Sequence, residues 1–499
     1  MNMPFSHSLT LDRVEFKLNS SMATSEQKTL RRQTIRALEQ VSIHPAIPPA
    51  AILIVRRLPD AKPGQLLANG QAGLSDQAAH RRRTWEQATQ HALTGCWQTA
   101  YRPMAETVPS TANSVRFIDT AEWLACLSLD LDEGIAGDHW WWTVPLRPYR
   151  QQSRETVLSA LWQSQAQWVP TAFKSLCQRH PEKTARLLDR LSPVVLEAVL
   201  SAIASTYRFS LSAPFSEVIQ TLSPYVPTTA QNLTRQKSES VQVLIALSWT
   251  LPAAVQILQT PLTAGIQYDE LSTENNQVPL VEDDKREVQN QEKAEQDEKD
   301  VPSHTHSDLE ILKETDSERT ARRPEALPAE SLQHIEQATS ADIGVRTELG
   351  GLWYLVNVLS NLGWPRSSPT LTPWHQLLAL SKGLISQRSL SREPYFTQLS
   401  DPVWDIFTEQ TQPSCPGILL EQWYQKTSRQ VLSYLNDRLD EPTEIVSYLR
   451  ESATLYFTNT HVDIVFSLEQ IRMDLRIAGL DQDPGWVPEL GRAIAFHYE

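Results

Sequence analysis

The spacing of apolar residues in the first half of the chain predicts both strands and helices. Alternation of apolar and polar positions indicates half-buried strands, and apolar residues at intervals of three and four indicate helices with one buried face. The predicted strands are 14–18, 52–55 and the segment around Val115 and Phe117, and the predicted helices are 25–41 and 120–131. From 154 to 207 the pattern is helical throughout, and Pro170, Pro181 and Pro193 divide it into short helices that each begin near a proline.

The second half changes from a helical period to a strand period near Pro442. Helices are predicted for 352–362, which ends at Gly363, and for 374–385 and 419–439. After Pro442, strict alternation over 462–466, 471–477 and 494–498 predicts three strands of a small antiparallel sheet with one face on the helices.

Charge separates these two halves. Residues 282–300 (EDDKREVQNQEKAEQDEKD) hold nine acidic and four basic side chains and almost no apolar ones. Such a segment buries too little surface to offset the entropy of ordering, so we expect a disordered, extended linker. The predicted organisation is an N-terminal part (1–268), a linker (269–340) and a C-terminal part (341–499). The predicted fold class is α+β, mostly helical, with the sheet at the C-terminus.

Composition places the protein among soluble cytoplasmic chains. No secretory signal is visible at the N-terminus, and Cys96, Cys126, Cys177 and Cys415 show neither metal-binding nor disulfide spacing. Residues 241–258 are uncharged and about long enough to cross a bilayer, but the central Pro252 and several polar residues favour core helices. Whether this stretch contacts a membrane is left open by the sequence.

Nucleic-acid binding is disfavoured by the net charge of −14. The best basic patch is formed by Arg81, Arg82 and Arg83, followed by Trp85. These arginines follow a polar stretch and are interpreted as a solvated loop.

The sequence contains none of the common short catalytic motifs. It has no phosphate-binding loop, dinucleotide-binding fingerprint, zinc-protease helix or nucleophile elbow. Residues 130–134 resemble a calcium loop only in part and lack its closing glutamate. The best candidate for a metal site is His461 with Asp463, which share a strand face, together with Asp481 and Asp483. The simpler interpretation is a polar strand face followed by a turn. We therefore expect no enzyme activity, cofactor, metal or small-molecule substrate.

A tryptophan run is the first candidate for a contact surface. If Trp140, Trp141 and Trp142 are extended, they cannot all face one way, so at least one is exposed.

The ending, THVDIVFSLEQIRMDLRIAGLDQDPGWVPELGRAIAFHYE, resembles an uncharacterised family from gene clusters of phage-tail-like contractile injection systems. The resemblance is specific in Gly479-Leu480-Asp481, Asp483-Pro484-Gly485-Trp486 and Gly491-Arg492. Looser islands are FIDTAEWLACLSLDLDEGIAGDHWWW, GGLWYLVNVLSNLGW (which includes Trp353), LTPWHQLLAL and DPVWDIF. The GLWYLVNVLSNLG helix is also similar to a segment of tape-measure proteins, from which this chain departs at its N-terminus. The resemblance implies protein partners within such a particle and carries over no catalytic residue.

Three functions remain as hypotheses. The first is a non-enzymatic assembly or accessory protein of a contractile injection particle, acting through protein–protein contacts. The second is a general two-module scaffold or chaperone. The third is a metal-dependent hydrolase that uses His461, Asp463 and Asp481.

Overall fold

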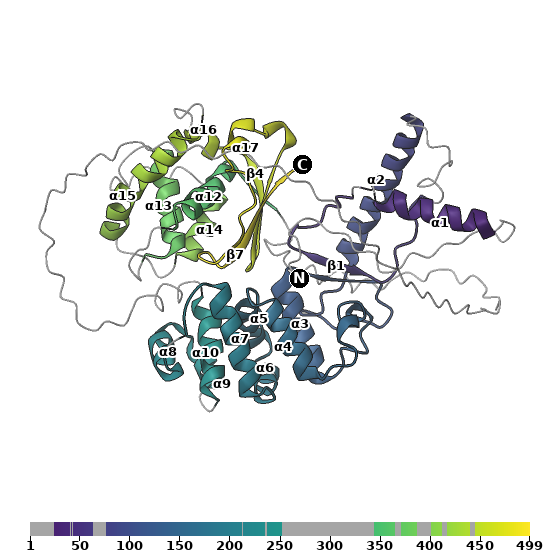
Figure 1. Ribbon diagram of the computed structural model, residues 1–499, viewed down its shortest axis with the longest axis horizontal. Helices are drawn as coiled ribbons and strands as arrows, with labels where there is room; N and C mark the ends of the chain where they lie inside the picture. Colours follow the sequence, from purple (N-terminus) through teal and green to yellow (C-terminus); the bar gives the residue numbers. More distant parts are fainter. Residues whose placement is uncertain are drawn as a thin grey trace, which may run out of the picture. The chain divides into compact units, whose positions relative to one another are not determined.

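The computed structural model describes a mostly helical protein with a small sheet in its C-terminal part (Figure 1). The residues described are 24–39, 41, 43–62, 76–211, 213–234, 237–251, 344–364, 371–386, 401–411, 417–439 and 445–499. The α+β class predicted from the sequence is confirmed. The predicted strand at 14–18 and the predicted linker at 269–340 lie outside these ranges.

The described part of the chain opens with a helix and includes a two-stranded antiparallel sheet. Strand β1 (Ile52–Val55) pairs with β2 (Ser114–Phe117), and both strands lie where the apolar pattern predicts them. The helices of this region are α1 (Thr24–Glu39) and α2 (Asp76–Thr99). Helix α2 contacts β2 and carries Arg81, Arg82 and Arg83. The prediction of a loop for these arginines is wrong, because the surrounding sequence is rich in helix-forming Ala, Gln and Glu.

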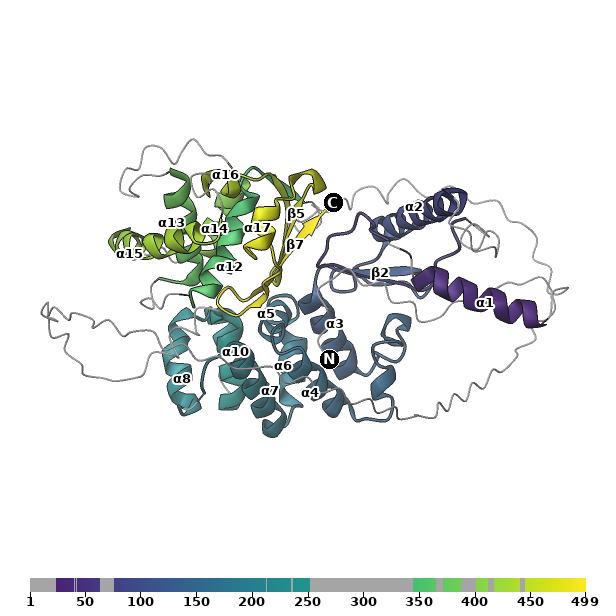
Figure 2. The same cartoon turned by 45° about the horizontal axis from the view of Figure 1, so that its top comes forward.

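A run of short helices follows, in which neighbouring helices pack side by side and α10 lies toward one end (Figures 1 and 2). The elements are α3 (Thr120–Glu133), η1 (Trp140–Trp142), η2 (Arg147–Tyr149), α4 (Arg154–Ser164), α5 (Val169–Arg179), α6 (Pro181–Asp189), α7 (Pro193–Thr206), α8 (Phe215–Leu222), η3 (Ser223–Tyr225), α9 (Thr228–Thr234) and α10 (Glu239–Thr250). Helices α5, α7 and α8 all contact α10, whose residues Val243, Leu244 and Leu247 are fully buried.

Proline and capping residues set the boundaries of these helices. Pro170, Pro181 and Pro193 each occupy the first turn of a helix, where the missing N–H costs nothing, so the predicted division is confirmed. Helix α3 begins where the Asp119 side chain accepts from the Glu122 N–H at 2.9 Å. It ends at Gly134, whose φ of 77° suits a glycine.

The C-terminal part is a five-stranded sheet covered by helices on one face (Figures 1 and 2). The strand order is β3 (Val345–Thr347), β4 (Ala453–Phe457), β5 (His461–Phe466), β7 (Arg492–Tyr498) and β6 (Gly485–Val487). Three neighbouring pairs are antiparallel, and β5 pairs with β7 in parallel. The parallel pair is possible because the chain between these two strands is long enough to cross over.

One sheet face is apolar because alternate residues of each strand point to the same side. Val462, Ile464 and Phe466 of β5 and Ile494 and Phe496 of β7 belong to a core shared with the helices. These helical elements are η5 (Gly350–Trp353), α12 (Tyr354–Asn361), α13 (Pro373–Ser386), α14 (Pro402–Gln410), α15 (Gly417–Asn436) and α16 (Ile445–Leu449). Helices predicted at 352–362, 374–385 and 419–439 are therefore confirmed within a few residues.

The predicted strand at 471–477 is wrong. Residues Met473–Ile477 form a short helix, α17, which follows the turn η8 (Leu468–Gln470). Ser467 and Gln470 form a capping box at the start of η8, which directs the chain away from the sheet. Only Leu475 of this helix is buried, whereas strict alternation predicts four residues on one buried face.

Residues on both sides of the gap at 252–343 contribute to one compact unit. Ala493 of β7 belongs to the core of the N-terminal helices, and Trp486 of β6 packs against that core. No helix among the residues that the structure describes is long and apolar enough to cross a membrane. Helix α10 accounts for the first half of the apolar stretch at 241–258, and residues beyond Leu251 lie outside the described part.

Candidate interaction site on the C-terminal sheet

The turn before β6 is held to the sheet by its two aspartates. Asp481 Oδ2 accepts from the Tyr498 hydroxyl at 3.0 Å and from Arg476 Nε at 3.1 Å. Asp483 Oδ1 accepts from the backbone N–H of Phe496 at 2.7 Å. Both carboxylates therefore fix the turn onto β7.

The remaining small residues of the C-terminal signature shape the β6–β7 hairpin. Gly485 has φ of 66° and Gly491 has φ of 64°, which are values that L side chains rarely adopt. Pro484 is half-buried just before Gly485. These residues turn the chain so that Val487 of β6 pairs with Arg492 of β7.

Trp486 joins the sheet to the N-terminal helices. Its ring meets that of Trp168 edge-on at 5.0 Å and that of Tyr207 edge-on at 5.1 Å. Edge-to-face geometry is the favoured arrangement of aromatic pairs, because the positive ring edge meets the negative face. Trp486 is therefore a structural contact within the molecule.

Arg492 is a buried cation beneath this junction. Its guanidinium donates to the carbonyl oxygen of Thr458 and to Gln410 Oε1, the latter at 2.9 Å, and it lies 4.4 Å from the centre of the Phe457 ring. Burial lowers the pKa of Arg492 to about 10, and the carboxylate of Asp119 opposes this shift. The side chain therefore remains charged at neutral pH.

His461 and Asp463 share a sheet face, as the sequence predicts, because they pair with Ala493 and Ala495 of β7. The His461 ring stacks on Trp168 at 4.8 Å. Asp463 Oδ1 lies 2.9 Å from Nε2 of His497, and its buried Oδ2 has no hydrogen-bond partner in the described part of the chain.

Asp481 is separated from this pair by the sheet. Asp481 accepts a hydrogen bond from Tyr498, whereas Asp463 is hydrogen-bonded to His497. Because neighbouring residues of β7 point to opposite faces of the sheet, the two aspartates lie on opposite faces. The set His461, Asp463 and Asp481 of the hydrolase hypothesis is therefore not assembled. Among the residues whose positions are described, no three His, Cys, Asp or Glu side chains are grouped to hold a metal ion.

His461 and His497 are expected to change the folding stability in opposite directions as the pH falls. Burial lowers the pKa of His461 from 6.5, so the unfolded chain takes up its proton first and stability falls as pH drops through 6.5. Burial also disfavours charge on His497, but the hydrogen bond and charge of Asp463 raise its pKa overall. The stability from His497 is therefore present below 6.5 and is lost as pH rises through its raised folded pKa.

We expect His461→Phe to make acid destabilisation shallower and His497→Asn to make it steeper. Phenylalanine keeps a ring against Trp168 and removes the titrating group. Urea unfolding of both variants and the parent between about pH 8 and pH 5 measures the slopes. Identical slopes in all three proteins would show that neither histidine contributes.

The tryptophan run forms one turn of 3₁₀ helix and not an extended surface. Trp142 is fully buried, and its Nε1 donates to Asp130 Oδ2 at 2.6 Å. Trp141 is buried against His139, with ring centres 4.4 Å apart, and Trp140 is half-buried. The run therefore mainly serves the core. Asp130, from the rejected calcium loop, is its hydrogen-bond acceptor.

Trp353 is also a core residue. It is fully buried in the C-terminal core, where its ring lies 5.3 Å from Phe407 and 6.3 Å from Trp374. Cys126 and Cys177 are free thiols buried in the N-terminal core, and burial raises the pKa of Cys177 to about 12. Cys415 lies outside the described residues.

Three exposed apolar side chains lie close together in sequence within the C-terminal signature and are called the apolar row. Leu468 of η8 is 58% exposed, and Met473 and Ile477 of α17 are 63% and 81% exposed. Met473 and Ile477 are four residues apart and share one face of the helix. The strand predicted at 471–477 assigned Met473 and Ile477 to a buried face, so their exposure was not predicted.

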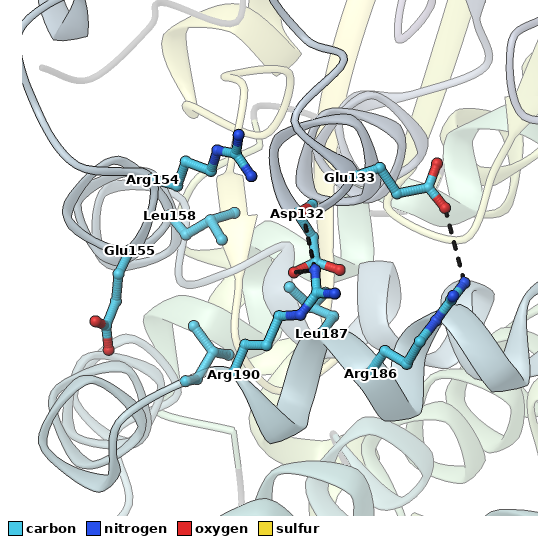
Figure 3. A pocket seen from close by; sticks show the side chains of 9 residues that line it. Asp132, Glu133, Arg154, Glu155, Leu158, Arg186, Leu187 and Arg190 are labelled. Atoms are coloured by element: carbon cyan, nitrogen blue, oxygen red, sulfur yellow. Dashed lines mark hydrogen bonds and ion pairs between the residues drawn. The ribbon is translucent and has the colours of Figure 1, made fainter.

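A pocket of about 590 Å³ lies between the end of α3, the start of α4 and helix α6 (Figure 3). Arg190 lies 2.9 Å from Asp132, and Arg186 lies 3.9 Å from Glu133. Glu155 points away from this pair of contacts and accepts from the Ser192 N–H at 2.8 Å. Because the lining charges largely pair with one another, the pocket favours no ligand of either sign.

Comparison with known proteins finds no match for this chain among protein-family models, curated proteins or solved structures.

Proposed function

We propose that the protein is a non-enzymatic assembly or accessory protein of a phage-tail-like contractile injection system, and that it binds particle components in the cytoplasm. The proposal takes its context from the resemblance of the C-terminal signature. The observation that carries a contact function is the exposed apolar row of Leu468, Met473 and Ile477 within that signature.

The row contrasts with the polar groups around it. Asp481, Asp483 and Arg492 of the same signature are engaged in hydrogen bonds within the molecule. Solvent exposure of large apolar side chains in an otherwise well-bonded module is typical of a protein-binding surface. The signature residues therefore build a rigid support, and the apolar row is the part that partners contact.

We expect the double variant Met473→Ser with Ile477→Ser to lose its partners and to remain folded. Exposed positions contribute little to stability, so the change in the free energy of unfolding is within about 0.5 kcal/mol. Tagged protein is purified from its native host, and co-purifying sheath, tube and baseplate components are measured by mass spectrometry. Loss of two anchoring side chains of an interface is expected to reduce recovery at least about tenfold.

Val194→Ser is the matched control, because Val194 is 75% exposed on α7, outside the signature. It should retain all partners of the parent. If no particle component co-purifies with the parent chain, the particle context is wrong. If components co-purify equally with the double variant, the apolar row is not the contact surface.

A further inference from the structure

Strand β1 has one edge that no strand in the described part of the chain covers. Strand β2 is covered on both sides, by β1 and by a parallel bridge from Tyr101 to Val115. Among the described strands, β1 pairs with β2 alone. An uncovered edge presents backbone N–H and C=O groups in the spacing that another strand requires.

The register shows which backbone groups face this edge. The N–H of Arg56 donates to the carbonyl of Asn113 at 2.7 Å, just beyond the pairs Val55↔Ser114 and Ile54↔Val115. Hydrogen-bonded positions alternate in an antiparallel pair, so Ile54 and Ile52 bond inward to β2. The N–H and C=O groups of Leu53 and Val55 therefore point outward.

The strand is apolar on both faces. Ile52 and Ile54 pack against the N-terminal core, and Leu53 and Val55 are half-buried on the other side. β1 therefore lacks the outward charges that usually protect an edge strand from pairing.

The end of this edge is basic, although the whole chain is acidic. Arg56 and Arg57 are exposed directly after β1, and neither is paired with a carboxylate in the described part of the chain. Arg116 lies opposite Leu53 on β2, and its buried Nε has no hydrogen-bond partner there. The guanidinium of Arg116 lies 4.9 Å from the centre of the Trp97 ring, so Arg56 and Arg57 are the exposed charges at the end of β1 that favour a negatively charged occupant.

Helix α2 contacts β2 and is tied to the segment after β1. Trp85 Nε1 donates to Asp60 Oδ1 at 2.9 Å, which ties the helix to the segment that follows β1. Arg82 and Arg83 are exposed on the turn of α2 before Trp85, and Arg82 lies 3.7 Å from Glu86.

We propose that the open edge of β1 binds an extended, acidic segment of a partner protein, which joins the sheet as an additional strand. Main-chain hydrogen bonds to Leu53 and Val55 supply the affinity, and Arg56 and Arg57 select carboxylates. This binding mode follows from strand geometry and charge, and it does not depend on whether the protein belongs to a contractile injection particle. A nucleic acid fits less well, because it has no strand of alternating N–H and C=O groups to pair with the outward groups of β1.

The probe is a fluorescent peptide in which valine alternates with glutamate, titrated against the full-length protein. The same peptide with lysine in place of glutamate is the control, and we expect it to bind at least about tenfold more weakly. Hydrogen exchange with residue resolution should show that the acidic peptide protects the amides of Leu53 and Val55, while the inward amide of Ile54 is already protected without it.

Two variants test the outward backbone N–H groups and the basic side chains separately. Leu53→Pro removes an outward N–H without touching the β2 ladder, because proline is tolerated at the open side of an edge strand. It should abolish binding, whereas Leu53→Val should bind like the parent. Arg56→Glu with Arg57→Glu should weaken the acidic peptide at least about tenfold. This charge variant tests the proposal even if the proline variant fails to fold.

Several results would overturn the inference. These are no saturable binding of the acidic peptide, equal affinity for both peptides, or unchanged binding by a folded Leu53→Pro. Tight binding of oligothymidylate with none of the peptide would assign the surface to nucleic acid. If the amides of Leu53 and Val55 are protected without peptide and deletion of residues 1–23 removes this protection, the edge binds this chain's own N-terminal segment. If dilution removes the protection, the edge binds a second copy of the chain.

Discussion

Replacing Gly351 by alanine is expected to lower the free energy of unfolding by about 3 kcal/mol or more. A Cβ on Gly351 would lie 1.8 Å from the carbonyl oxygen of Tyr448 and 3.0 Å from the Cα of Leu449. Both contacts are with backbone, so relief requires moving helix α16 away from η5. Chemical denaturation of the variant measures the loss.

Gly95→Ala is the matched control for this prediction. Gly95 lies inside helix α2, and no atom lies within 4 Å of its ideal Cβ. Alanine there is expected to stabilise the helix by roughly 0.5–1 kcal/mol, because glycine is the poorer helix former. If the two variants have similar stabilities, the close approach of η5 to α16 is not the constraint described above.

Arg492→Ala is expected to destabilise the protein by about 3–5 kcal/mol. The change removes the hydrogen bonds to Thr458 and Gln410 and leaves the buried carboxylate of Asp119 without its nearby cation. Arg492→Lys keeps the charge and loses the planar fork, so its loss should be smaller. Urea unfolding at neutral pH measures both variants.

Arg346→Ala controls for the loss of a cation from the same sheet. Arg346 is exposed on the edge strand β3, so its removal should change the free energy of unfolding by less than about 0.5 kcal/mol. Equal losses in Arg492→Ala and Arg346→Ala would contradict a structural role for the buried cation.

Local patterns in the sequence located the elements with a strong apolar period, but the sequence analysis did not predict helices α2 and α14 or strands β3, β4 and β6. Pro170, Pro181 and Pro193 mark helix starts by chemistry that is independent of the rest of the fold. The alternation of β5 and β7 was recognisable for the same reason, because one face of each strand must be apolar. The parallel pairing of these strands was not recognisable, because alternation indicates a strand but not its direction.

The candidate site was harder to predict because its residues have several possible roles. Trp486 and Arg492 were predicted as interface or motif residues, but their surroundings include Trp168 and Asp119, which are hundreds of residues away in the chain. For Ile471 and Ile477, the alternation typical of a strand was misleading, because residues Met473–Ile477 form a short helix that leaves Ile477 exposed. Tertiary context therefore decides which apolar residues are available to partners.

The place of β7 between β5 and β6 has a consequence for how the protein is made. A growing chain can pair β6 with β7 only after residues 492–498 have left the ribosome. Until then, Trp168 and Tyr207 from the earlier helices have no Trp486 to pack against. Nascent chains of this protein should therefore expose an aromatic surface through most of their synthesis, which is the kind of surface that chaperones hold.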